Sequence, residues 1–156
     1  MGGQLYAQAE PTETIAEAQQ SIVDSFEFLE DWNDRYQYLI QLGRQPQPFA
    51  EEKIEENRIL GCQSGVWLIC GFSNGNLNFA ATSDSAIVAG IIALLLQVYS
   101  GRRPQQILTN SPTFIDEIGL NQHLSPHRSN GLALMLERIH AFATAHVSEG
   151  LAKDIS

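Results

Sequence analysis

Residues 57–68 read Asn57-Arg58-Ile59-Leu60-Gly61-Cys62-Gln63-Ser64-Gly65-Val66-Trp67-Leu68 and place one cysteine between two glycines, just before the most apolar strand-like run. Glycine adopts backbone conformations that are closed to other residues, so Gly61 and Gly65 predict a sharp turn with the thiol at a loop tip. A core cysteine would instead lie inside a periodic apolar segment and be inert. The local pattern alone leaves a reactive thiol and a structural thiol both open.

A β-hairpin is predicted directly after this stretch. The run from Val66 to Phe72 is apolar on both faces, and Asn74-Gly75 is the dipeptide that two-residue hairpin turns favour. Apolar residues then alternate along the return strand, at Leu77, Phe79 and Ala81. The antiparallel pairing places the Cys62 loop at the hairpin end opposite the turn. Cys70 falls within the first strand and is interpreted as a small buried hydrophobic residue.

A buried helix is predicted after the hairpin, over Ile87 to Tyr99, where the sequence is apolar nearly all round. Ser83 is the expected N-cap, and Asp84 is expected in the first turn. This helix would begin at the Cys62 end of the hairpin, where its N-terminus lowers the pKa of a nearby thiol. Asp84 would oppose that shift, so the net effect on the thiol stays open.

The remaining segments predict one domain over residues 22–148, between a flexible N-terminal extension (1–21) and a frayed C-terminal tail (149–156). Apolar residues at three- and four-residue spacing predict a helix from Ile22 that stops at Gly43. A short helix is expected from Ser111-Pro112 to Ile118, and residues 120–124 are expected to form a connector. Ser125-Pro126 is expected to begin the last helix. Its predicted buried stripe comprises Leu132, Met135, Leu136, Ile139, Phe142 and Ala143.

Composition excludes several classes of protein. The formal net charge is -9 and no Lys/Arg cluster is present, which argues against nucleic acid and suits a protein partner with a basic docking surface. Two cysteines are too few for a disulfide scaffold, and no secretory signal is recognisable. The most apolar window, Ala86 to Val98, is too short to span a bilayer. We therefore expect no membrane association and a reducing, cytoplasmic location.

Four kinds of functional site can be weighed against the residues present. A metal centre would need about four thiolate or imidazole ligands, and the candidates are Cys62, Cys70, His123 and His127. A Cys–His hydrolase would need a base fixed near Cys62, which no pattern places there. No glycine-rich nucleotide fingerprint occurs. A single loop thiol without catalytic apparatus is typical of a carrier that receives a group and passes it on.

The chain resembles the SufE family of sulfur-acceptor proteins in four blocks that occur in the family's order between Phe26 and Ala145. The first is Gly61-Cys62-x-Ser64-x-Val66-Trp67-Leu68, and the second is Ser83-Asp84-x-Ala86-Ile87-Val88-x-Gly90. The third is Gly101-x-x-Pro104 with Ile107. The fourth is Gly119-Leu120-x-x-His123-Leu124-Ser125-Pro126-x-Arg128-x-Asn130-Gly131-Leu132.

This resemblance implies an α+β fold of SufE/IscU type, with a small antiparallel sheet packed by helices. It implies that Cys62 accepts persulfide sulfur from a cysteine desulfurase, stimulates that enzyme, and passes the sulfur to an iron–sulfur cluster scaffold complex. The protein would then be a sulfur-transfer partner more than a stand-alone enzyme. It would hold no metal or cofactor of its own, because the pyridoxal phosphate belongs to the SufS-like desulfurase. The alternative is a scaffold that binds the metal or cluster itself.

The resemblance also suggests roles for residues around the acceptor. Gly61, Gln63, Ser64 and Gly65 would shape its loop. Asp84 and Arg128 match charged family positions near the loop and would set its conformation or contact the desulfurase. A helix-capping role for Asp84 and a surface ion pair for Arg128 stay open. His123 is interpreted as a structural anchor of its connector more than as a partner contact.

Overall fold

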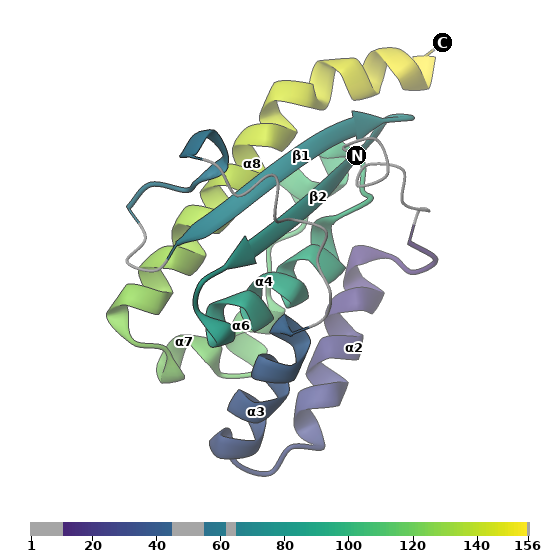
Figure 1. Ribbon diagram of the computed structural model, residues 1–156. Coiled ribbons are helices and arrows are strands. Elements are labelled where there is room, and N and C mark those ends of the chain that lie inside the picture. Colours follow the sequence, from purple (N-terminus) through teal and green to yellow (C-terminus); the bar gives the residue numbers. More distant parts are fainter. Residues whose placement is uncertain (1–10, 45–54, 62–64, 156) are drawn as a thin grey trace.

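The computed structural model describes residues 11–44, 55–61 and 65–155 of the chain. A hairpin of two strands lies against helices, with α4 (Ala86–Tyr99) behind it and α8 (Pro126–Ile155) running along its length (Figure 1). Helix α4 is the centre of the fold, because it packs against α2 (Ile15–Glu27), α3 (Trp32–Gly43), β2 and α8. The predicted α+β architecture, a small antiparallel sheet packed by helices, is confirmed.

The hairpin forms as the sequence predicts. Strand β1 (Val66–Ser73) pairs with β2 (Asn76–Ser83) in antiparallel register, from Val66 opposite Ser83 to Ser73 opposite Asn76. Asn74 and Gly75 have φ angles of 55° and 85°, which are the positive values that a type I′ turn requires. Both faces of the hairpin carry buried apolar residues. Leu68 and Phe79 belong to the main core, and Ile69 and Ala80 form a second cluster on the other face.

The N-terminal part differs from the prediction in two respects. Helix α2 begins at Ile15, because Thr14 and Glu17 form a reciprocal capping box in which each side chain accepts from the other's backbone N–H. Ile15, Ala18 and Gln19 are buried, so the prediction of a flexible extension is wrong from Ile15 onward. Residues 1–10 lie outside the described part of the chain.

The helix predicted from Ile22 to Gly43 is in fact two helices. The first ends at Glu27, and the second starts anew at Trp32 because the Asp31 carboxylate caps it by accepting from the Asp34 N–H at 2.8 Å. The predicted stop at Gly43 is confirmed.

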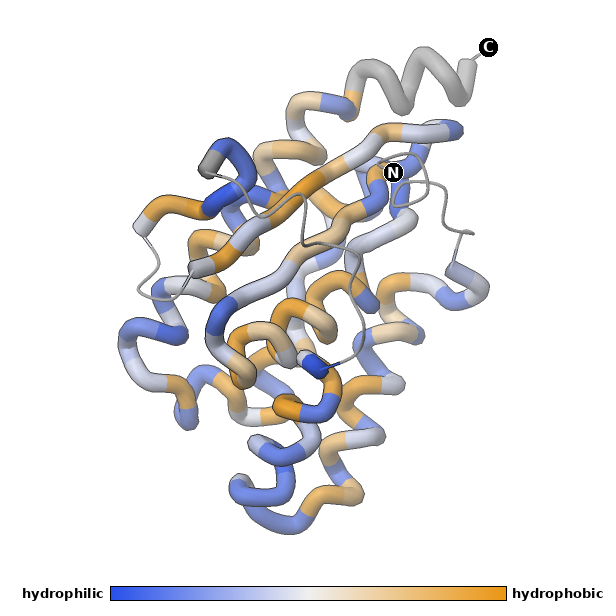
Figure 2. The backbone as a smooth tube through the Cα atoms, in the orientation of Figure 1, coloured by the Kyte–Doolittle hydropathy of each residue, from blue (hydrophilic) through white to orange (hydrophobic). Residues whose placement is uncertain are grey.

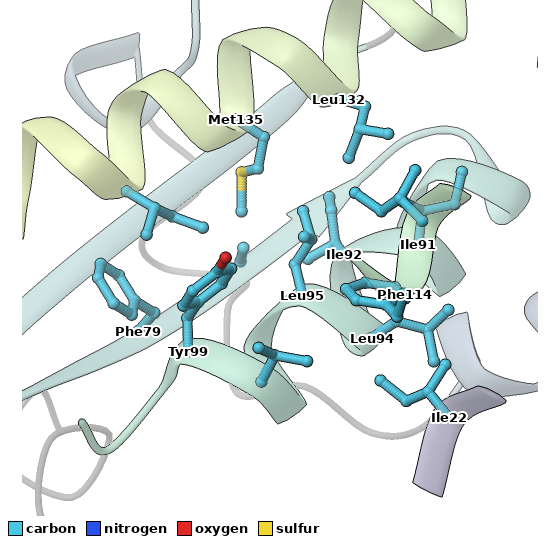
Figure 3. Packing of buried hydrophobic residues seen from close by; sticks show 14 of the residues in the cluster. Ile22, Phe79, Ile91, Ile92, Leu94, Leu95, Tyr99, Phe114, Leu132 and Met135 are labelled. Carbon is cyan, nitrogen blue, oxygen red and sulfur yellow. The ribbon is translucent and has the colours of Figure 1, made fainter. Parts of the chain in front are cut away.

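Helix α4 supplies most of the central packing. Figure 2 shows apolar residues concentrated along it, and Figure 3 shows Leu95 and Tyr99 of α4 near Phe79 of β2 and Met135 of α8. A methyl group at Gly90 would collide with the backbone carbonyl of Leu39, so α3 and α4 cross with their backbones in close contact. Within the described ranges, no helix is both long enough and apolar enough to cross a membrane.

The cap of α4 differs from the prediction. Ser85 is the N-cap and accepts from the Val88 N–H at 3.3 Å, whereas Ser83 and Asp84 precede the helix. Ser83 does not serve as the cap because β2 extends to it and its hydroxyl donates to the Gly65 carbonyl oxygen at 2.8 Å.

The C-terminal half is more helical than predicted. Pro104 begins α5 (Pro104–Thr109), and the predicted connector contains α7 (Leu120–His123). Helix α6 (Phe114–Glu117) begins two residues after Pro112. Helix α8 begins at Pro126 as predicted, and its backbone continues as helix to Ile155, through the segment predicted to fray. Leu132, Met135, Ile139 and Ala143 form its buried stripe as expected, whereas Leu136 and Phe142 of the predicted stripe are only partly buried.

Candidate functional site

The cysteine of the opening stretch lies in a loop whose two ends are paired. The Ile59 N–H donates to the Val66 carbonyl oxygen at 2.8 Å, and Arg58 forms an antiparallel bridge with Trp67. The short 3₁₀ helix η1 (Glu55–Asn57) leads into this pairing. The two flanks therefore run antiparallel on either side of residues 62–64, and the position of the thiol at a loop tip stays a prediction. Cys62, Gln63 and Ser64 lie outside the described residues.

The downstream end of the loop is fixed at Gly65. Its carbonyl oxygen accepts from the Ser83 hydroxyl at 2.8 Å and from the Asp84 N–H at 3.0 Å. A methyl group at Gly65 would overlap the Trp67 ring and lie 2.5 Å from Oδ2 of Asp84. No residue larger than glycine fits here without a shift of these neighbours, and the expectation of a special backbone conformation at Gly65 stays a prediction.

The upstream end of the loop is fixed at Gly61. This residue has a φ of 94°, the left-handed region that glycine enters without steric cost, so the conformational expectation is confirmed here. Its carbonyl oxygen accepts from Nδ2 of Asn130, on the first turns of α8, at 3.0 Å. The position of a Cβ on Gly61 lies 3.1 Å from Cδ1 of Leu134, also on α8. The loop therefore enters along the N-terminal part of α8.

Asn130 also lies at the loop, although no pattern in the sequence predicts a role for it. It belongs to the fourth block of the family pattern, two positions after Arg128 and directly before Gly131. Its partner lies 69 positions earlier in the chain, and no local pattern reports such a contact. The only hint of this contact in the sequence is that Asn130, which has a side-chain hydrogen-bond donor, is one of the residues that carry the resemblance.

Two of the predicted supporting residues lie at the loop. The Asp84 carboxylate lies against Gly65, at the junction between β2 and α4. Arg128 lines a small apolar hollow together with Val66, Val88 and Gly131, so it lies beside the residue that follows Gly65. The structure thus brings Gly61, Gly65, Asp84 and Arg128 to one end of the hairpin. Their predicted roles in loop conformation or partner contact stay predictions.

His123 makes a different set of contacts. Its ring stacks on Trp32 of α3, with centroids 3.8 Å apart and an angle of 16° between the planes. Its Nδ1 lies 3.0 Å from the Gly119 carbonyl oxygen, and its own carbonyl oxygen accepts from the Tyr36 hydroxyl at 2.7 Å. These contacts join α7 to α3, and none of them involves the loop flanks. They fit the interpretation of His123 as a structural anchor.

Cys70, the second thiol, is built into the hairpin. It lies opposite Phe79 in the register and packs partly buried against the main core. Burial raises the pKa of the Cys70 thiol to about 12, since the thiolate loses its hydration there. At neutral pH this thiol is protonated and a poor nucleophile or metal ligand. Among the described residues, no group of three or more His, Cys, Asp or Glu side chains is placed to hold a metal ion.

Comparison with known proteins identifies the family. Residues 20–143 match the family model of SufE, the Fe-S metabolism associated domain. The chain belongs to the SufE family. It is 43% identical over 124 residues to an uncharacterized SufE-like protein of Rhizobium etli, a match that covers 76% of this chain and 84% of the relative. It is 38% identical over 128 residues to an uncharacterized SufE-like protein of Rhizobium meliloti, covering 78% of this chain and 91% of the relative.

A solved structure shares the fold of this SufE-family chain. The solution structure of a hypothetical protein from Thermus thermophilus superimposes with a TM-score of 0.68 and 22% sequence identity. The match covers 84% of this chain and 96% of that protein. At this identity the likeness shows the fold alone.

Proposed function

We propose that this SufE-family protein is a sulfur carrier. Cys62 accepts persulfide sulfur from a pyridoxal-phosphate cysteine desulfurase, stimulates that enzyme, and passes the sulfur to an iron–sulfur cluster scaffold complex. The family's place in Fe–S metabolism supports the setting. The cofactor belongs to the desulfurase, and the carrier contributes the thiol.

One observation supports the proposal: the chain has two cysteines, and Cys70 is partly buried in β1, where burial raises the pKa of its thiol to about 12. Cys62 therefore stands as the thiol available for chemistry, in a loop whose flanks Gly61 and Gly65 are both hydrogen-bonded to the body of the protein. A carrier needs one accessible thiol. The alternative, a scaffold that binds the metal or cluster itself, needs several ligating thiolates or imidazoles, and the burial of Cys70 weighs against it.

The transfer step is an exchange between sulfur atoms. The Cys62 thiolate attacks the terminal sulfur of the desulfurase persulfide, a bond forms between these two sulfurs, and the donor's own S–S bond breaks. The donor cysteine leaves as a thiolate and takes up a proton. The sulfane sulfur keeps its oxidation state, so the step needs no external oxidant or reductant. Delivery to the scaffold repeats the exchange with Cys62 as the donor.

The experiment is intact-mass analysis after incubation with a pyridoxal-phosphate cysteine desulfurase and L-cysteine, without reductant. We expect the wild-type protein to gain the mass of one sulfur atom and the Cys70→Ser variant to gain the same. The Cys62→Ser variant should gain none and should not stimulate the desulfurase. Loading that survives Cys62→Ser would rule out Cys62 as the acceptor. Wild-type protein that takes no sulfur but retains iron after cluster assembly would favour the scaffold.

A further inference from the structure

We propose that Asn130 is a positioning residue for sulfur transfer: its side-chain amide anchors the peptide group that joins Gly61 to Cys62 onto helix α8. This inference rests on the proposed function, because it assigns Asn130 to the presentation of the acceptor thiol.

The contact itself is well defined. Nδ2 of Asn130 donates to the Gly61 carbonyl oxygen at 3.0 Å. Leu134, four residues later on the same helix face, places its Cδ1 3.1 Å from the position that a Cβ on Gly61 would take. The helix beneath is held in the core by Leu132 and Met135. One face of α8 thus offers a polar contact and an apolar contact to a single loop residue.

The planar peptide bond links the Gly61 carbonyl group to the backbone of Cys62. The carbonyl oxygen of Gly61 lies in the same planar peptide group as the nitrogen and Cα of Cys62, because rotation about the C–N bond is strongly restricted. A hydrogen bond to that oxygen therefore restrains the plane from which the Cys62 side chain departs. Gly61 itself has a φ of 94°, a conformation that favours glycine, so the residue that accepts this hydrogen bond is one that the backbone geometry also specifies.

The chemistry benefits from this restraint. Sulfur exchange requires the attacking thiolate to lie in line with the breaking S–S bond, and a loop held in advance loses less conformational freedom on reaching that geometry. Asn130 is exposed, so water competes for its hydrogen bond and the contact adds little to global folding. Its loss should consequently act on the transfer step more than on stability.

The test compares Asn130→Asp, which replaces the donor amide by an acceptor, with Asn130→Gln, which keeps a donor. Asn110→Asp is the matched control, because the Asn110 side-chain amide also donates to a backbone carbonyl in an exposed hydrogen bond, to Gln106 at 2.7 Å. The first readout needs no desulfurase: hydrogen–deuterium exchange of the peptide covering residues 59–66. We expect faster exchange in Asn130→Asp, a smaller increase in Asn130→Gln, and wild-type exchange in Asn110→Asp.

The second readout is the rate of sulfur loading from a cysteine desulfurase at saturating and at limiting carrier. Loss of one neutral hydrogen bond predicts a fall in the saturated rate of about 2- to 12-fold in Asn130→Asp, with little change in the half-saturating concentration. Asn130→Gln should recover part of the rate. Wild-type loading by Asn130→Asp, or an equal loss in Asn110→Asp, would overturn the inference.

The two proposals fail in different ways. If the wild-type protein takes no sulfur from the desulfurase, the proposed function fails, whereas the exchange comparison still decides whether Asn130 holds Gly61. If the wild-type protein loads normally and exchange over residues 59–66 is unchanged in Asn130→Asp, the positioning role alone fails.

Discussion

The N–H of Ile59 lies 2.8 Å from the carbonyl oxygen of Val66 and donates to it, so the chain enters and leaves the cysteine loop at adjacent positions. Antiparallel pairing is therefore present at both ends of the hairpin, around the Asn74-Gly75 turn and between the two flanks of the cysteine loop. Gly75 lies in the β-turn at one end and Gly61 in the cysteine loop at the other, with φ angles of 85° and 94°. These two glycines form a natural pair for separating loop geometry from stability.

We predict that Gly61→Ala and Gly75→Ala each lower the free energy of unfolding by about 1 kcal/mol, because both force a side chain into the left-handed region. A Cβ at Gly75 meets nothing within 4 Å, so its cost is conformational alone. Only Gly61→Ala should also slow sulfur loading from a desulfurase. Urea unfolding and intact-mass loading measure the two effects.

The control is built into the pair. Equal slowing of sulfur loading by both substitutions would trace the effect to general destabilisation of the hairpin, and would contradict a specific role of the loop backbone.

Most of the fold was predictable because its signals are local. Asn74-Gly75 specifies the turn, alternation specifies the strands, and the apolar run specifies α4. The division between α2 and α3 was missed because Phe26, Leu29 and Trp32 keep helical spacing across the break, which is set by the Asp31 cap. The start of α2 at Ile15 was missed because few large apolar residues precede Ile22.

The site was predictable only in part. Gly65 lies beside Asp84 because Gly65 directly precedes β1 and Asp84 directly follows β2 in the antiparallel hairpin. This proximity follows from the topology alone. The Asn130–Gly61 contact joins residues 69 positions apart and depends on how α8 packs, which no periodicity reports. The role of Gly65 depends on the distance to the Trp67 ring and the Asp84 carboxylate, and only the packed structure supplies that.

Leu60 offers a second prediction, because its side chain is 75% exposed two residues before Cys62. An exposed leucine beside the acceptor suits burial against the desulfurase. We expect Leu60→Asp to raise the half-saturating concentration of the carrier about tenfold, since burying a leucine contributes roughly 1.5 kcal/mol or more. The saturated rate of loading should change little.

Phe28 provides the control for this prediction. It is 83% exposed, in the turn between α2 and α3, and Phe28→Asp should leave desulfurase stimulation unchanged. If both substitutions weaken stimulation equally, general surface charge is the cause, and Leu60 has no specific contact.

His123 leads to a prediction of the opposite kind. His123→Ala removes the stack on Trp32 and should lower the free energy of unfolding by about 0.5–1.5 kcal/mol. Sulfur loading of the folded protein should stay at the wild-type rate, because no described contact of His123 reaches the loop flanks. If folded His123→Ala protein takes up sulfur more slowly than the wild type, His123 contributes to partner contact.

The last prediction concerns the Cys70 thiol, which should make the free energy of unfolding fall at alkaline pH. Burial raises the pKa of its thiol from 9.0 to about 12, and burial likewise raises the pKa of the Tyr99 hydroxyl from 10.0 to about 12. At a pH between a group's ordinary pKa and its raised pKa, the group is deprotonated in the unfolded chain and still protonated in the folded chain. The unfolded state then binds fewer protons, so the free energy of unfolding falls as pH rises. We predict that the free energy of unfolding from urea titrations begins to decline near pH 9. In Cys70→Ala the decline should be shallower from that pH, and in Tyr99→Phe it should be shallower only above about pH 10. A slope that neither substitution alters would mean that these two groups do not set the alkaline limit of the fold.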